Sequence, residues 1–124
     1  MKKRPINLNL FNIRFSVMAL VSISHRVSGV LIFLYLPLLL WCLNESLRSE
    51  ASYEHLRFLL GQMQWKVLLI VFLWSLWFHV LAGLRHMIMD FGLGLSKNRA
   101  RVSAWCLWVF FVLSAAAIGV KIWH

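Results

Sequence analysis

Residues 65–89 read WKVLLIVFLWSLWFHVLAGLRHMIM and form an almost continuous apolar stretch. This length is enough for a transmembrane helix, which needs ~20 residues to cross the hydrocarbon core of a bilayer. Two comparable stretches lie at about residues 23–43 and 102–123. None shows the period-two alternation of a membrane barrel, and only helices and closed barrels satisfy their backbone in lipid. The sequence therefore predicts an all-α membrane protein with three transmembrane helices.

The composition supports this fold class. Of the 124 residues, 61% are hydrophobic, which is more apolar surface than a soluble domain of this size can bury. We expect a single domain, residues 1–124, with an interfacial segment at residues 1–15, where asparagine alternates with apolar side chains. Ser16 is a candidate cap for the first span. The outer loop between the first two spans has a short helical pattern around residues 53–60.

The net charge of +9 raises the question of nucleic-acid binding. The cations instead flank the predicted spans, and with three spans the N-terminal segment and the second loop lie on the same side. That side holds Lys2, Lys3, Arg4, Arg14, Arg26, Arg85, Lys97, Arg99 and Arg101, and the other side holds Arg48, Arg57, Lys66 and Lys121. Cations concentrate on the cytoplasmic side of membrane proteins. The pattern predicts a cytoplasmic N-terminus, a C-terminus across the membrane, and lipid rather than nucleic acid as the partner.

Polar side chains at the cytoplasmic end of the first span form one candidate site. Ser22 and Arg26 are four residues apart and Gly29 follows three later, so a helix places a hydroxyl, a guanidinium and a bare backbone patch on one face. Together these groups are suited to a ligand with an anionic or carbonyl group. Alternatively, Arg26 reaches lipid phosphates and His25 lies at the interface, as cationic side chains at helix ends commonly do. The residues alone leave both interpretations open.

His79 forms the second candidate site. It lies roughly 21 Å along the helix from Trp65 at ~1.5 Å per residue, at a depth where an ionisable side chain needs a partner or a ligand. Ser75, Gly83 and His86 share its face, and the glycine allows a flat ring system to approach closely. This arrangement suits an axial haem ligand. The alternative is an interhelical hydrogen bond.

One iron cannot be held from opposite sides by His79 and His86. These residues share one helix face and are about 10 Å apart by helix rise. The second ligand of a six-coordinate haem would have to come from another chain. Arg85 lies near the cytoplasmic boundary, at a depth suited to a carboxylate such as a haem propionate.

Both candidate sites resemble the signatures of a known family, the cytochrome b556 subunit of succinate dehydrogenase. The first signature resembles Arg4-Pro5, then Ser22, then His25-Arg26-Val27-Ser28-Gly29. The second resembles His79, Gly83-Leu84-Arg85-His86-Met87 and Met89-Asp90-Phe91-Gly92. The two motifs, their order and the three predicted spans cover most of the chain.

This resemblance implies the larger of two membrane anchors in a heterotetramer, with a second small anchor, an iron–sulfur subunit and a flavoprotein as partners. By similarity, His79 is one axial ligand of haem b and the partner anchor supplies the other. The resemblance assigns Ser22 and Arg26 to the ubiquinone site, and His25, Arg85 and His86 to the surroundings of the haem propionates. The complex would pass electrons from succinate, oxidised in the flavoprotein, to ubiquinone. We expect it in the bacterial cytoplasmic membrane rather than the mitochondrial inner membrane.

Other classes of function have distinct requirements. In a purely structural anchor, His79 packs against a partner helix and no haem is bound. A small transporter or proton channel needs a continuous polar path, but Ser103 and Ser114 are the only hydroxyl groups in the third span. The anchor of a fumarate reductase would serve the reverse reaction. The sequence distinguishes neither the direction of the reaction, nor the quinone type, nor whether heterotetramers associate further.

Overall fold

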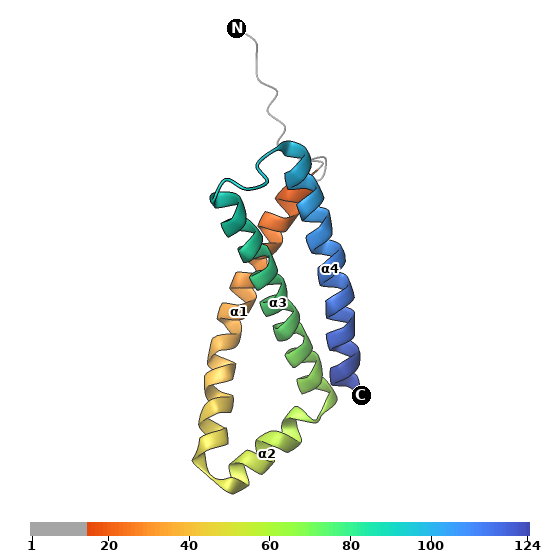
Figure 1. Ribbon diagram of the computed structural model, residues 1–124. Helices are drawn as coiled ribbons and strands as arrows, with labels where there is room; N and C mark the ends of the chain where they lie inside the picture. Colours follow the sequence, from red (N-terminus) through yellow and green to blue (C-terminus); the bar gives the residue numbers. More distant parts are fainter. Residues whose placement is uncertain (1–14) are drawn as a thin grey trace, which may run out of the picture.

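The computed structural model describes residues 15–124, which form four helices (Figure 1). These are α1 (Val17–Arg48), α2 (Glu50–Leu60), α3 (Met63–Asp90) and α4 (Lys97–Trp123). Helices α1, α3 and α4 are each long and apolar enough to cross a membrane. The predicted all-α fold with three candidate spans is thus confirmed. Apart from Phe15, the predicted interfacial segment lies outside the described residues.

Capping residues extend the helices beyond the apolar stretches. Helix α1 begins at Val17, and the Ser16 hydroxyl accepts a hydrogen bond from the backbone N–H of Ala19 at 3.3 Å. The predicted cap is confirmed. Helix α2 begins at Glu50, earlier than predicted, because Ser49 and Ser52 form a reciprocal capping box. Serine caps therefore set the starts of α1 and α2, whereas the apolar stretches mark only the part that can lie in lipid.

The three long helices run beside one another, and α2 crosses one end of the bundle (Figure 1). Helices α1 and α4 begin at the end where α3 finishes, and α4 finishes at the other end. At the α2 end, Trp41 of α1 stacks on Trp65 of α3 with 5.9 Å between ring centroids. The Tyr35 hydroxyl of α1 also donates to the backbone carbonyl of Leu68 in α3 at 3.0 Å. Which end faces the cytoplasm stays a prediction from the charge distribution.

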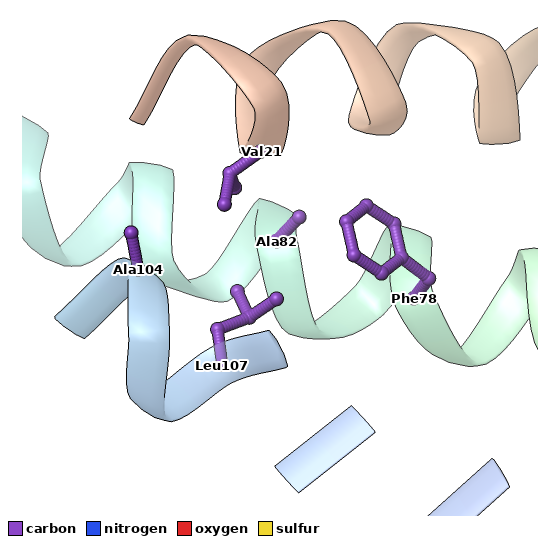
Figure 2. Close-up of a cluster of buried hydrophobic side chains, with 5 residues drawn as sticks. All are labelled: Val21, Phe78, Ala82, Ala104 and Leu107. Carbon is purple, nitrogen blue, oxygen red and sulfur yellow. The ribbon is translucent and has the colours of Figure 1, made fainter. Parts of the chain in front are cut away.

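A small apolar core joins the three long helices (Figure 2). It consists of Val21 from α1, Phe78 and Ala82 from α3, and Ala104 and Leu107 from α4. Small residues such as these alanines allow membrane helices to approach closely, which matters because lipid supplies no hydrophobic force between helices. Val21 and Ala82 lie about one turn from His25 and His79. The core therefore fixes α1 against α3 next to the candidate haem ligand.

Both hydroxyl groups of the third span take part in helix packing. The Trp77 indole of α3 donates to the Ser114 hydroxyl of α4 at 2.7 Å, and the Arg85 guanidinium of α3 donates to the Ser103 hydroxyl at 3.1 Å. Each serine hydroxyl also donates to a carbonyl of its own helix. Both side chains are therefore engaged in contacts between helices.

Candidate functional site

The imidazole of His79 forms an interhelical hydrogen-bond network with α1. Its Nδ1 lies 3.0 Å from the Ser28 hydroxyl oxygen and 3.1 Å from the backbone carbonyl oxygen of His25. The Ser28 hydroxyl donates to that same carbonyl at 2.7 Å. The interhelical hydrogen bond considered from the sequence is therefore present.

These contacts indicate which nitrogen of His79 carries the proton. A carbonyl oxygen can only accept a hydrogen bond, and the single hydroxyl proton of Ser28 is directed to that carbonyl. Both contacts of Nδ1 therefore require Nδ1 to be the donor. The lone pair of the neutral imidazole is then on Nε2, which forms no hydrogen bond with the residues that the structure describes. The packing contact and a ligand role use different nitrogens, so the two interpretations are compatible.

Three imidazoles form what we call the histidine cluster: His25, His79 and His86. The His25 ring stacks on that of His79, with centroids 4.1 Å apart and planes inclined by 16°. It is tilted by 57° relative to the His86 ring at 5.3 Å. Two glycines provide the space, because a Cβ on Gly29 would lie 3.1 Å from His79 Cε1, and one on Gly83 would lie 3.4 Å from His25 Nε2. The flat ring beside Gly83 is therefore the imidazole of His25.

Ser22 and Arg26 lie on the outer side of α1, next to the histidine cluster along the chain. The buried residues of α1 are Val21 and Ser28, whereas Ser22 is half-buried and Arg26 is exposed. Neither side chain forms a hydrogen bond or an ion pair within residues 15–124. A ligand would therefore contact them from outside the three-helix bundle.

Arg85 faces α4 and not the histidine cluster. Its side chain is buried, with a relative exposure of 9%. Nε donates to the Ser103 hydroxyl at 3.1 Å and Nη2 donates to the backbone carbonyl of Ala100 at 2.9 Å. The structure thus brings together two of the three predicted propionate neighbours, His25 and His86, and places the third on another face of α3.

Ser28 belongs to the site, although the sequence assigned it no role. Serines in membrane helices commonly donate to a carbonyl of their own helix, as Ser28 does to His25. One feature of the sequence could have identified Ser28: it lies three residues after His25 and immediately before Gly29. Its contact with His79 depends on the rotation of α1 against α3, which the motif does not specify.

Comparison with known proteins places these features in a family. Residues 1–121 match the family described as the succinate dehydrogenase/fumarate reductase transmembrane subunit. The chain is 38% identical over 122 residues to the succinate dehydrogenase cytochrome b556 subunit of Coxiella burnetii, which covers 98% of each chain. It is 30% identical to the subunits of the same name from Paracoccus denitrificans (84% of this chain and 80% of the relative) and Rickettsia prowazekii (95% and 92%). The chain therefore belongs to the succinate dehydrogenase/fumarate reductase transmembrane subunit family and is a membrane anchor subunit of such a complex.

Proposed function

We propose that this subunit holds haem b together with a second anchor and forms part of the site at which ubiquinone is reduced with electrons from succinate. His79 is one axial ligand of the iron through Nε2. The observation that carries this proposal is that Nδ1 of His79 is hydrogen-bonded to α1, which leaves Nε2 with its lone pair. The name of the relatives, cytochrome b556, supports a b-type haem.

The residues of the cluster fit such a group. Metal-bound histidines almost always donate their second ring N–H to a carbonyl, a carboxylate or water, and His79 has two acceptors for that proton. The His79 side chain also keeps part of its surface exposed, so it is accessible from outside the bundle. When bound, haem b supplies reversible one-electron transfer. The protein supplies binding, orientation and electrostatics.

A second protein ligand to the iron would come from the partner anchor. Axial imidazoles meet an iron with a ring nitrogen from opposite sides, whereas the His25 and His79 rings lie face to face at 4.1 Å. His86 lies on the same helix as His79, two turns further along. Neither residue can therefore complete the coordination on the opposite side of one iron. His25 and His86 are instead neighbours of the haem propionates. Arg85 is a weaker candidate for that role, because α4 engages its guanidinium.

Ser22 and Arg26 hold the quinone. The Arg26 guanidinium donates to a quinone carbonyl and stabilises the negative charge that develops on this oxygen during reduction, while the Ser22 hydroxyl orients the ring. The exposure of Arg26 and its lack of a partner within the described residues support this role. Succinate is oxidised in the flavoprotein, the iron–sulfur subunit connects it to the anchors, and the complex lies in the bacterial cytoplasmic membrane.

The test is the visible spectrum of the purified complex, reduced minus oxidised, for wild type and His79→Leu at matched subunit levels. His55→Leu is the control, because His55 is an exposed histidine of α2, remote from the cluster. We expect a b-type signal in wild type and His55→Leu, and its loss or alteration in His79→Leu. An unchanged signal in His79→Leu would place the iron ligand elsewhere. A wild-type complex without a b-type signal would instead support the alternative function, a purely structural anchor that binds no haem.

A further inference from the structure

We propose that Ser28 is a positioning residue for the iron ligand: its hydroxyl fixes the orientation of the His79 imidazole and makes Nε2 a stronger electron donor, which lowers the reduction potential of the haem. This inference rests on the proposed role of His79. It adds a residue for which neither the motifs nor the comparisons provide a function.

Three short contacts form a closed hydrogen-bond triangle. The distances are 2.7 Å from the Ser28 hydroxyl to the His25 carbonyl, 3.0 Å from that hydroxyl to His79 Nδ1, and 3.1 Å from Nδ1 to the carbonyl. The hydroxyl donates to the carbonyl and accepts from Nδ1–H, while the carbonyl accepts from both. Ser28 is 4% exposed. Water therefore has little access to the hydroxyl group that fixes the ring.

Ser75 is a second buried serine close to His79 and provides a contrast with Ser28. Both serines are buried and both donate to a carbonyl of their own helix, Ser28 to His25 and Ser75 to Val71. Of these two serines, Ser28 also meets a side chain of another helix, whereas the hydrogen bond of Ser75 stays within α3. Gly29 makes this approach feasible, because the Cε1 edge of the His79 ring lies only 3.1 Å from the position that a Cβ of residue 29 would take.

The hydrogen bond has an electronic consequence. A ring N–H that donates to a good acceptor acquires partial imidazolate character, which raises the basicity of the other nitrogen. A more basic axial ligand stabilises ferric iron more than ferrous iron, so the potential falls. Without the Ser28 hydroxyl, Nδ1–H keeps only the His25 carbonyl, and the ring loses one of the two contacts that fix its rotation.

The experiment is a redox titration of the haem in the purified complex, together with the electron paramagnetic resonance spectrum of the oxidised form. The variants are Ser28→Ala and Ser28→Cys, and the control is Ser75→Ala, which removes a buried hydroxyl one turn from His79. We expect haem binding in all three. In both Ser28 variants we expect the midpoint potential to rise and the largest g value to shift, because the alanine side chain has no acceptor for Nδ1–H and the cysteine thiol is a poor one. Ser75→Ala should match wild type.

Two results would overturn the inference: Ser28 variants with the wild-type potential and g values, or the same changes in Ser75→Ala. If Ser28→Ala does not assemble, Ser28→Cys decides by the same criteria, since cysteine is close to serine in size. Failure of the underlying function has a different signature, namely a wild-type complex without haem or an unaltered haem spectrum in His79→Leu.

Discussion

At the scale of single residues, the two glycines of the histidine cluster differ in how much room they leave. A Cβ on Gly29 would lie 3.1 Å from His79 Cε1, closer than almost all real contacts of this kind, whereas a Cβ on Gly83 would lie 3.4 Å from His25 Nε2. Both residues are in helices, so alanine gives the same gain of up to ~1 kcal/mol in helix propensity at either position. Any difference between the effects of the two alanine substitutions therefore reports on their contacts with the His79 and His25 rings.

Gly29→Ala should displace the His79 imidazole, whereas Gly83→Ala should be tolerated. We expect Gly29→Ala to lower the haem content and to alter the spectrum of the oxidised haem, because the ring that would bind iron must move by a few tenths of an ångström. The measurement is the haem-to-protein ratio and the paramagnetic resonance spectrum of the two purified complexes. Equal spectra and equal haem content in both variants would contradict the close approach of His79 to Gly29.

Arg26→Leu should separate quinone reduction from succinate oxidation. A hydrogen bond from a charged donor is worth about 1.5–3 kcal/mol, so its loss lowers the rate of quinone reduction roughly 10- to 150-fold. Succinate oxidation with an artificial dye acceptor should stay near the wild-type rate, because in the proposed function succinate is oxidised in the flavoprotein, away from Arg26. The control is Arg101→Leu, since Arg101 is an exposed cation of α4 near the same end of the bundle. Equal loss of both activities would indicate failed assembly.

The sequence predicted which residues of α3 share a face, but not which residues of α1 they meet. His79 was predicted from its depth in an apolar span, and the shared face of Gly83 and His86 from helical spacing. The stacking of His25 and the contact of Ser28 were not predicted. They depend on how α1 is rotated about its axis, and a helix whose surface is apolar almost all round does not encode that rotation.

At the scale of helices, the pair α3 and α4 is held by polar side chains in an apolar environment. The Trp77 indole donates to the Ser114 hydroxyl at 2.7 Å, and the Trp74 indole donates to the Ala115 carbonyl at 2.9 Å. Arg85 joins the other end of the pair through Ser103 and Ala100. The indole N–H of a buried tryptophan needs a partner, and α4 provides one for each of these two residues.

The contact between Trp77 and Ser114 should show measurable coupling in a double-mutant cycle. Hydrogen bonds between helices in membranes contribute on average about 0.6 kcal/mol and at most about 1.7 kcal/mol, so we expect Trp77→Phe and Ser114→Ala to interact by an energy in this range. The free energies of unfolding would be measured by titrating the complex with sodium dodecyl sulfate in mixed micelles. A coupling energy of zero would mean that the indole finds another acceptor. Val109, an exposed residue of α4, provides a control cycle of Trp77→Phe with Val109→Ala.

The spans were predicted well at this scale because hydropathy reports on lipid exposure directly. The predicted starts at residues 23, 65 and 102 fall within α1, α3 and α4, which begin at Val17, Met63 and Lys97. The differences arise where polar residues continue a helix outside the apolar stretch. The Ser16 cap fixes the start of α1, whereas Gln62 and Ser96, at the starts of α3 and α4, form no side-chain cap hydrogen bond. Hydropathy detects neither kind of end.

At the scale of the whole molecule, the described chain leaves much of its surface without a protein neighbour. Helix α1 buries only Val21 and Ser28 among its residues, and apolar side chains such as Phe33 and Leu34 are 68% and 64% exposed. Lipid can cover these apolar side chains. It covers the partly exposed imidazoles of His25 and His79 less well, because an ionisable side chain within a span costs several kcal/mol unless it has a partner or a cavity. The polar side of α1 therefore needs a second protein or a bound ligand.

The subunit should consequently be unstable without the second anchor that we propose as its partner. When the subunit is produced alone, the polar side of α1 lacks a protein partner and the proposed iron ligand, His79, lacks the second anchor that would help to hold the haem. We therefore expect a several-fold lower amount of the chain in membranes and no bound haem. Co-expression with the partner anchor should restore both, whereas co-expression with only the flavoprotein and iron–sulfur subunits should not. Quantitative immunoblotting of membranes and a haem assay would measure this. A chain that accumulates alone to the same level, and elutes as a single species in detergent, would show that lipid suffices for the surface on which the proposed two-anchor site depends.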